Sequence, residues 1–163
     1  MIKVAILTIS DKGFRGERED GTGPAIKSLI ENHQYKVEYY KVIPDEMEQI
    51  QKELIYICDE LKIELALTNG GTGFSQRDVT PEATRNVIEK YVPGIGEVMR
   101  LRSLEITPKA MLSRAIAGIR KQTLIINLPG SPKGAVENLG FIMPALAHGI
   151  EILTGQASEC ARK

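Results

Sequence analysis

The chain has 163 residues, 42% hydrophobic and 26% charged, and this length suits a single domain over residues 1–163. Its 21 basic side chains balance 21 acidic ones, so nothing in the overall charge favours binding to nucleic acid or to anionic membranes. No apolar stretch reaches the roughly 18 residues of a membrane span, and the N-terminus enters a strand-like run without a signal peptide. The sequence therefore predicts a cytoplasmic protein.

In the first half of the chain, short β-branched runs alternate with helical segments. Strands are predicted over residues 4–9, 36–43 and 64–68, and the first of these is apolar throughout, as expected for a strand covered on both faces. One helix is predicted from a cap at Thr22 to about His33. Another is predicted to begin at Asp45, with an apolar face made of Ile50, Leu54, Ile57, Cys58 and Leu61.

The second half continues the alternation. Thr80 and Pro81 are predicted to open a helix that Pro93 ends, and a shorter helix is predicted over residues 95–103. Residues 115–119 and 123–127 are predicted to pair as an antiparallel hairpin. Ser131 is predicted to cap a long helical region that is interrupted at Pro144. The alternation predicts an α/β fold with three layers, α/β/α, around a mostly parallel sheet.

The two cysteines show none of the spacings of metal ligands. Cys58 falls in a predicted helix and is expected to be a buried thiol, whereas Cys160 falls in the polar C-terminal tail. A chain of this length can build its own core, so no disulfide is expected.

The strongest functional pattern is the glycine loop, defined as residues 69–80, which follows the third predicted strand. Three glycines in four residues permit positive φ angles and leave backbone N–H groups open to an anion. Thr72 and Ser75 add hydroxyl donors, Arg77 adds a cation, and Asp78 adds a carboxylate suited to Mg²⁺. The alternative is an ordinary strand-to-helix turn, but such a turn does not require the Arg-Asp pair. The loop has neither the ending of a P-loop nor the spacing of a dinucleotide fingerprint.

Two other loops follow predicted strands, where ligands bind in parallel α/β sheets. Residues 129–131 are predicted to make a second phosphate contact, although Ser131 could simply start a helix. Ser10 and Asp11 follow the first strand and are candidates for the site, whereas the charges between Arg15 and Asp20 suit a solvated surface loop.

Two acidic residues have an open interpretation. Asp45 lies just past a strand end, where it could face Asp78 and bind a metal, but a capping pattern with Glu48 would also explain it. Glu97 follows the Pro93-Gly94 break and has the same ambiguity.

Several ordered motifs in this chain resemble those of the MoaB/Mog family of molybdenum cofactor biosynthesis. The resemblance rests on residues 68–73 with 77–84, on 93–100, on 112–114 and on 127–133, and residues 8–11 and 19–24 also fit. It covers essentially the whole chain.

Members of that family have a three-layer α/β fold, commonly form homotrimers and bind molybdopterin. Mog-type members are molybdopterin adenylyltransferases, which transfer AMP from ATP, with Mg²⁺, to the molybdopterin phosphate and release pyrophosphate. The resemblance therefore implies this activity, with ATP and molybdopterin as substrates and a downstream molybdenum insertase as a partner. The alternative is a non-catalytic molybdopterin-binding or carrier protein of the same pathway.

The resemblance also assigns roles to residues. Asp45 and Asp78 match family positions associated with Mg²⁺ and catalysis, which favours a metal role for Asp45 over capping. Ser113 and residues 129–131 are expected to hold the pterin or its phosphate. The full set predicted to bind substrate is Ser10, Asp11, Asn69, Gly70, Gly71, Thr72, Gly73, Ser75, Arg77, Glu97, Ser113, Pro129, Gly130 and Ser131.

Overall fold

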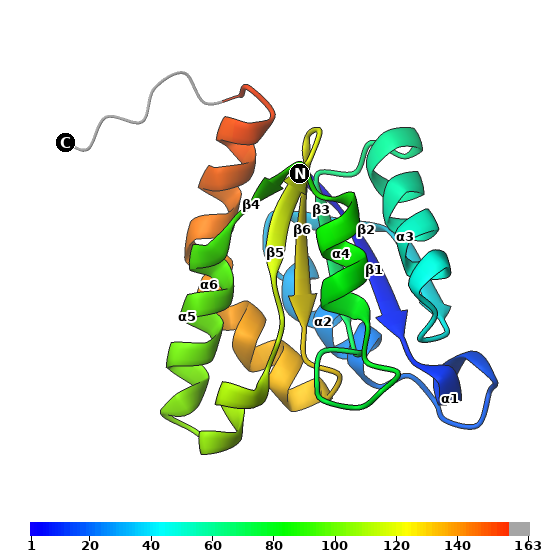
Figure 1. Ribbon diagram of the computed structural model, residues 1–163. Coiled ribbons are helices and arrows are strands. Elements are labelled where there is room, and N and C mark those ends of the chain that lie inside the picture. Colours follow the sequence, from blue (N-terminus) through cyan, green and yellow to red (C-terminus); the bar gives the residue numbers. More distant parts are fainter. Residues whose placement is uncertain (157–163) are drawn as a thin grey trace.

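A six-stranded sheet forms the middle layer of the computed structural model, which describes residues 1–156 (Figure 1). The strand order is β2-β1-β3-β6-β5-β4. β1, β2, β3 and β6 run parallel, and β4 and β5 complete the sheet in antiparallel pairing. The strands are β1 (Ile2–Ile9), β2 (Tyr35–Ile43), β3 (Leu65–Asn69), β4 (Lys90–Tyr91), β5 (Ala117–Arg120) and β6 (Thr123–Leu128). The predicted hairpin is confirmed by β5 and β6.

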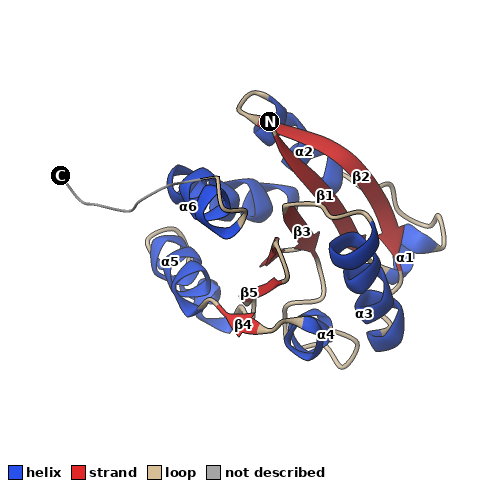
Figure 2. Cartoon of the chain, turned by 90° about the horizontal axis from the view of Figure 1, so that it is seen from above, coloured by secondary structure: helices blue, strands red, loops and turns tan. Residues whose placement is uncertain are grey.

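Helices cover both faces of this sheet (Figure 2). One layer contains α2 (Thr22–Glu31), α5 (Pro93–Leu104) and α6 (Pro132–Leu153), and both α2 and α5 pack against α6. The other contains α3 (Met47–Ile55) and α4 (Thr80–Val87). Shorter turns are α1 (Asp11–Phe14), the π-helical η1 (Tyr56–Glu60) and the 3₁₀-helical η2 (Pro108–Leu112). The predicted three-layer α/β/α fold is confirmed.

The core is divided by the sheet into two apolar clusters. In β1, Val4 and Ile6 face the cluster under α2, α5 and α6, while Ala5 and Leu7 face the cluster under α3 and α4. This alternation explains why β1 is apolar at every position from Val4 to Leu7. Cys58 is buried in the second cluster, as predicted, and burial raises the pKa of its thiol to about 11. Cys160 lies outside the described residues.

The predicted boundary between two helices near Pro93 is wrong. α4 ends at Val87, the two-residue strand β4 follows, and Pro93 lies in the first turn of α5 rather than ending a helix. Such a short strand has no periodic signal of its own, and it forms because Lys90 and Tyr91 pair with β5. Pro in the first helical turn is favourable, since its missing N–H would lack a partner there anyway.

The predicted interruption at Pro144 is also wrong, because α6 continues through it. A proline removes the bond to the carbonyl four residues earlier and clashes with it. That carbonyl belongs to Gly140, and both residues are exposed, so solvent can satisfy it. The Ser131 cap is confirmed, since its Oγ accepts a hydrogen bond from the N–H of Gly134 at 3.2 Å.

The caps considered for α2 and α3 from the sequence are not the ones observed. The capping acceptor at the start of α2 is Asp20, which accepts the N–H groups of Thr22 and Gly23 at 2.9 and 3.1 Å. α3 begins at Met47 after Glu46, which makes no side-chain cap bond, so capping by Asp45 with Glu48 is wrong. Within residues 1–156, no helix has the length and apolar character needed to cross a membrane.

Candidate active site

The carboxyl ends of β1, β3 and β6 meet at one edge of the sheet, where the glycine loop and α1 lie in Figure 1. Thr8 of β1 is in register with Asn69 of β3, and Asn69 is in register with Leu128 of β6. The N–H of Gly70 donates to the Leu128 carbonyl at 3.2 Å, so the glycine loop leaves β3 in contact with β6. The three loops predicted to carry the site are therefore side by side.

These loops surround a cavity of about 620 Å³. Its lining includes most of the predicted site residues at the strand ends: Ser10, Asp45, Asn69, Gly70, Gly71, Asp78, Gly130 and Ser131. A neighbouring cavity of about 350 Å³ is lined by Thr72, Gly73, Ser113, Pro129 and again Ser131. Ser131 borders both cavities at the N-terminus of the long helix α6, whose dipole favours an anion there.

The other predicted residues lie outside both linings. Glu97 is on the exposed face of α5. Asp11, Ser75 and Arg77 stand near the rim of the larger cavity, where each bonds another residue of the site. Their roles toward a substrate remain predictions.

Two glycines are required by the backbone of the glycine loop. Gly70 has a φ of +97°, and a Cβ on it would stand 2.2 Å from the carbonyl oxygen of Ile9. Gly71 has a φ of +68°, and a Cβ on it would stand 2.2 Å from Thr80 Oγ1 and 3.2 Å from Asp45 Oδ1. The positive φ angles predicted for the loop are confirmed at these two positions.

Hydrogen bonds within the glycine loop fix Asp78 in place. Its Oδ2 accepts the N–H of Ser75 at 2.9 Å. Arg114 crosses from the segment before β5 and donates to the carbonyls of Gly73 and Asp78, at 2.8 and 2.7 Å, while also pairing with Glu82. Arg114 falls in the 112–114 family motif but was not among the predicted site residues, because its bonds to two backbone carbonyls cannot be seen from the sequence.

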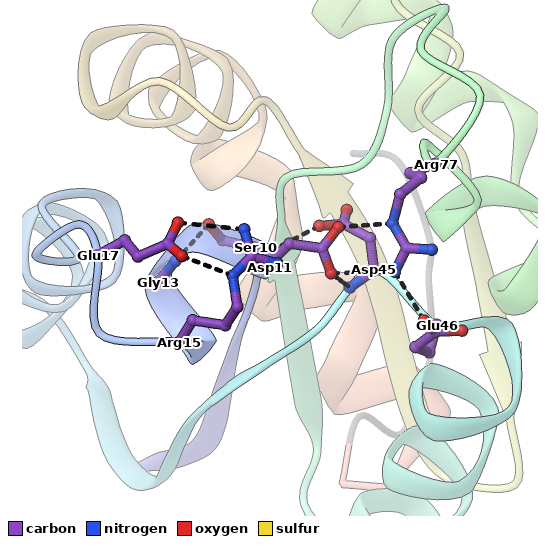
Figure 3. A network of polar contacts seen from close by, with 8 residues as sticks. All are labelled: Ser10, Asp11, Gly13, Arg15, Glu17, Asp45, Glu46 and Arg77. Carbon is purple, nitrogen blue, oxygen red and sulfur yellow. Dashed lines mark hydrogen bonds and ion pairs between the residues drawn. The ribbon is translucent and has the colours of Figure 1, made fainter.

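A charged network of Asp11, Asp45, Glu46 and Arg77 lies near the rim of the larger cavity (Figure 3). Asp11 and Asp45 are joined reciprocally: the N–H of Asp11 donates to Asp45 Oδ2 at 2.8 Å, and the N–H of Asp45 donates to Asp11 Oδ1 at 3.1 Å. Arg77 donates to both oxygens of Asp11, from Nε at 2.6 Å and from Nη2 at 3.0 Å. Its Nη2 also pairs with Glu46 at 2.7 Å.

The two joined carboxylates differ in their pKa values. Hydrogen bonding from Arg77 is the main cause that lowers the pKa of Asp11, against a smaller effect of burial. Burial raises the pKa of Asp45, and the negative charges of Asp11 and Asp78 add to this effect. Asp45 therefore lies in a position where an approaching cation is favourable.

Asp20 lines another part of the larger cavity and accepts hydrogen bonds from several residues there. Its Oδ2 accepts hydrogen bonds from Thr8 Oγ1 at 2.7 Å and from the Tyr40 hydroxyl. Asn69 in turn donates to Thr8 Oγ1 at 2.9 Å. Burial alone would raise the pKa of Asp20, but these donors and two backbone N–H groups lower it overall.

The interpretation of the charges between Arg15 and Asp20 as a solvated surface loop does not hold for Asp20, which lines the larger cavity. Two signals in the sequence point to Asp20: its position two residues before Thr22, where an Asp can cap a helix, and its place in the 19–24 segment that fits the family motifs. Thr22 links Asp20 to the loop before α6, because its N–H donates to Asp20 and its Oγ1 donates to the Gly130 carbonyl at 2.7 Å.

The residues present fit a Mg²⁺ ion bound together with substrate phosphates. Asp45 and Asp78 line the same cavity, and Mg²⁺ is commonly held by one or two carboxylates plus phosphate oxygens. Thr80 Oγ1 is buried under Gly71 and near Asp45, without a hydrogen-bond partner in the described part of the chain. No group of three or more His, Cys, Asp or Glu side chains within residues 1–156 could hold a metal ion by itself, so phosphate oxygens and water would complete the coordination of Mg²⁺.

Comparison with known proteins identifies the family. Residues 5–148 match the family described as a probable molybdopterin binding domain. The chain belongs to this molybdopterin-binding family. The predicted relationship to the MoaB and Mog proteins is thereby confirmed, and the match includes the strand ends and loops that surround both cavities.

Three relatives of this molybdopterin-binding protein are matched over more than nine tenths of their own length. The molybdopterin adenylyltransferase of Helicobacter pylori (strain ATCC 700392 / 26695) is 42% identical over 99% of this chain and 93% of the relative. The structure of the molybdopterin biosynthesis enzyme MoaB from Thermus thermophilus matches with a TM-score of 0.91 and 51% identity, over 95% of this chain and 98% of that one. The tungsten cofactor synthesizing protein MoaB from Pyrococcus furiosus matches with a TM-score of 0.83 and 33% identity, over 94% and 97%.

Proposed function

We propose that this protein is a molybdopterin adenylyltransferase, which transfers AMP from ATP to the terminal phosphate of molybdopterin. The observation that carries the proposal is the cavity at the strand ends, where the carboxylates of Asp45 and Asp78 lie beside the Gly70-Gly71 turn and the N-terminus of α6. Backbone N–H groups and a helix dipole suit phosphate oxygens, while paired carboxylates suit a divalent cation. Relatives named for this activity support it.

The reaction needs positioning and charge neutralisation more than acid–base chemistry. An oxygen of the molybdopterin phosphate attacks the α-phosphorus of ATP, and a new P–O bond forms while the bond to the pyrophosphate oxygen breaks. The attacking phosphate is already ionised near neutral pH, so no residue has to remove a proton. The glycine loop and Ser131 would hold phosphate oxygens, and the neighbouring cavity, with Ser113, would hold the rest of molybdopterin.

Asp45 and Asp78 would hold Mg²⁺ when it is bound, and the ion would supply positive charge to the phosphates. The rest of the chemistry depends on how firmly this chain holds the two carboxylates. The reciprocal bonds between Asp11 and Asp45, and the Ser75 bond to Asp78, provide that orientation.

The direct test is incubation of the purified protein with molybdopterin, ATP and Mg²⁺. We expect adenylyl-molybdopterin and pyrophosphate, and a folded protein that yields neither would contradict the proposal. Asp78→Asn is expected to lower the turnover rate by at least about a hundredfold, since charge stabilisation at such sites is worth several kcal/mol. Glu31→Gln, on the exposed face of α2, is the matched control and should leave turnover unchanged.

The second candidate is a non-catalytic molybdopterin carrier. Calorimetry separates the two, because only the adenylyltransferase requires a nucleotide site whose affinity increases with Mg²⁺. Molybdopterin binding without any ATP binding would favour the carrier.

Assembly and location belong to the same proposal. We infer a cytoplasmic homotrimer that delivers its product to a downstream molybdenum insertase. Light scattering should give three times the 18.0 kDa mass of one chain, and a monomeric mass would contradict the trimer.

A further inference from the structure

We propose that Arg77 is a positioning residue, which acts through Asp11 to hold the Asp45 carboxylate opposite Asp78 and does not itself bind the phosphates of ATP. The inference rests on the proposed function, since it concerns the same cavity. It reverses the expectation from the sequence that Arg77 supplies a cation to the phosphate. Figure 3 shows the side chain turned toward Asp11 and Glu46.

The first observation is that the guanidinium of Arg77 is already engaged. Nε and Nη2 form a two-pronged contact with Asp11, at 2.6 and 3.0 Å, and Nη2 also reaches Glu46 at 2.7 Å. Bidentate pairing of this kind is the strong form of an Arg–carboxylate contact. Arg77 lines neither cavity, so a phosphate in the larger one would have to compete with two carboxylates for it.

The second observation is the pair of reciprocal hydrogen bonds between Asp11 and Asp45. Each carboxylate accepts the N–H of the other residue, although the two lie 34 positions apart in the chain. These hydrogen bonds place two negative carboxylates close together. Their mutual repulsion weakens the hydrogen bonds unless a cation is nearby. Arg77 provides that cation on the outer side of Asp11, which leaves Asp45 facing the cavity.

The third observation is the position of Arg77 in the chain, immediately before Asp78. When Arg77 is bound to Asp11, the glycine loop is fastened to α1 and to the start of α3 at the residue next to Asp78. One side chain therefore sets both members of the carboxylate pair: Asp45 through Asp11, and Asp78 through the backbone. Loss of Arg77 should weaken cation binding while leaving the phosphate contacts of the Gly70-Gly71 turn in place.

The experiment measures ATP binding by calorimetry, first in EDTA and then over a range of Mg²⁺ concentrations. Arg77→Gln, Asp11→Asn and the double variant are compared with the wild-type protein. We expect each single variant to raise the Mg²⁺ concentration for half-maximal enhancement about tenfold, and the double variant to show no more than about the same tenfold change, because the two residues act as one unit. ATP affinity in EDTA should stay within about twofold of wild type.

Two further variants distinguish positioning from phosphate binding. Arg77→Lys keeps the positive charge but cannot form the two-pronged contact, so a positioning role predicts a loss like that of Arg77→Gln. Glu46→Gln is the matched control, because it removes only the exposed partner of Arg77, and its Mg²⁺ dependence should change less than about threefold.

Arg77 would instead be a phosphate ligand if Arg77→Gln weakened ATP binding in EDTA and Arg77→Lys restored it. The inference would also be overturned if the double variant shifted the Mg²⁺ dependence by the product of the two single shifts. Such a result means that the free-energy effects of Arg77→Gln and Asp11→Asn add, as they do for independent residues. Either result leaves the proposed function intact as long as wild-type protein binds ATP and forms adenylyl-molybdopterin. A wild-type protein that binds no ATP would overturn both.

Discussion

The larger cavity has two walls that hold carboxylates in opposite ways. The charged wall is formed by Asp45, which lines the cavity, and by Asp11, Glu46 and Arg77, which stand outside the lining and are held together by the half-exposed guanidinium of Arg77. The neutral-donor wall consists of Thr8, Asp20, Tyr40 and Asn69, where Asp20 accepts hydrogen bonds from hydroxyl and backbone N–H groups. Both walls keep a carboxylate ionised, but only the first depends on a counter-charge.

The difference indicates how the protein can bind a polyanion beside so many acidic side chains. The cation on the charged wall is already paired with carboxylates of the protein. Attraction for phosphate must then come from backbone N–H groups, from the α6 N-terminus and from a divalent cation. The neutral-donor wall contributes rigidity, because the bond from Asn69 to Thr8 joins β3 to β1. Thr22, whose N–H donates to Asp20, extends this network to the loop before α6 through its bond to the Gly130 carbonyl.

The largest effect is expected at Gly70, which follows β3 and lies against Ile9 at the end of β1. Gly70→Ala should destabilise the protein by more than about 3 kcal/mol, because it combines a positive φ with a clash against a backbone carbonyl that cannot move aside. Gly16→Ala is the control, since Gly16 has a φ of +73° but nothing within 4 Å, and should cost about 1 kcal/mol. Urea unfolding measures both, and equal losses would mean that strain alone explains them.

Removing the central acceptor of the neutral-donor wall is expected to have the next largest effect. Asp20→Ala leaves the Thr8 hydroxyl and two N–H groups without their acceptor, and should cost about 2–3 kcal/mol of unfolding free energy. Asp11→Asn on the charged wall should cost less than about 1 kcal/mol, because its pair with Arg77 is largely screened by solvent. Similar costs for the two variants would contradict the distinction between the walls.

A smaller effect of opposite sign is expected at Asp45. Its native pKa is raised, so the stabilisation that accompanies its protonation is complete below the ordinary carboxyl value of about 3.9 and is lost as the pH rises through the native value. At pH 7 the ionised side chain therefore destabilises the protein without ligand, and Asp45→Asn should increase stability by up to about 1 kcal/mol. Thermal unfolding at pH 7 and at pH 4 checks this, and a gain that is larger at pH 4 would contradict it.

The smallest expected effect is that of salt. The stability difference between wild type and Arg77→Gln should shrink by a few tenths of a kcal/mol between 0.1 and 1 M NaCl, because exposed ion pairs are screened. The difference between wild type and Asp20→Ala should not change. Urea titrations at the two salt concentrations test this, and equal salt sensitivity would remove the electrostatic distinction between the walls.

The sequence was sufficient for the parts of the molecule that local patterns determine. Short runs rich in β-branched and other apolar residues located β1, β2, β3 and β6, and the glycines located the loop with positive φ at Gly70 and Gly71. Patterns of this kind act over a few residues, so a single sequence contains them.

What the sequence could not provide were the contacts between distant segments. The strand β4 exists only because β5 lies beside it, and Arg77 finds its partner Asp11 across 66 residues. Asp20 is one of several charges in a polar loop, and nothing nearby in the sequence indicates that Thr8 and Tyr40 donate to it. Such partners follow from the completed fold.

The place of β6 in the sheet has a consequence for how the protein is made. β6 is the last strand along the described chain, yet it lies between β3 and β5 and pairs Leu124 with Leu65. Until the ribosome has made β6, one edge of β3 therefore has no partner strand. Both cavities also lack Ser131, which follows β6 and lines each of them. Such late, long-range pairing predicts that the site forms only after nearly the whole chain has been made.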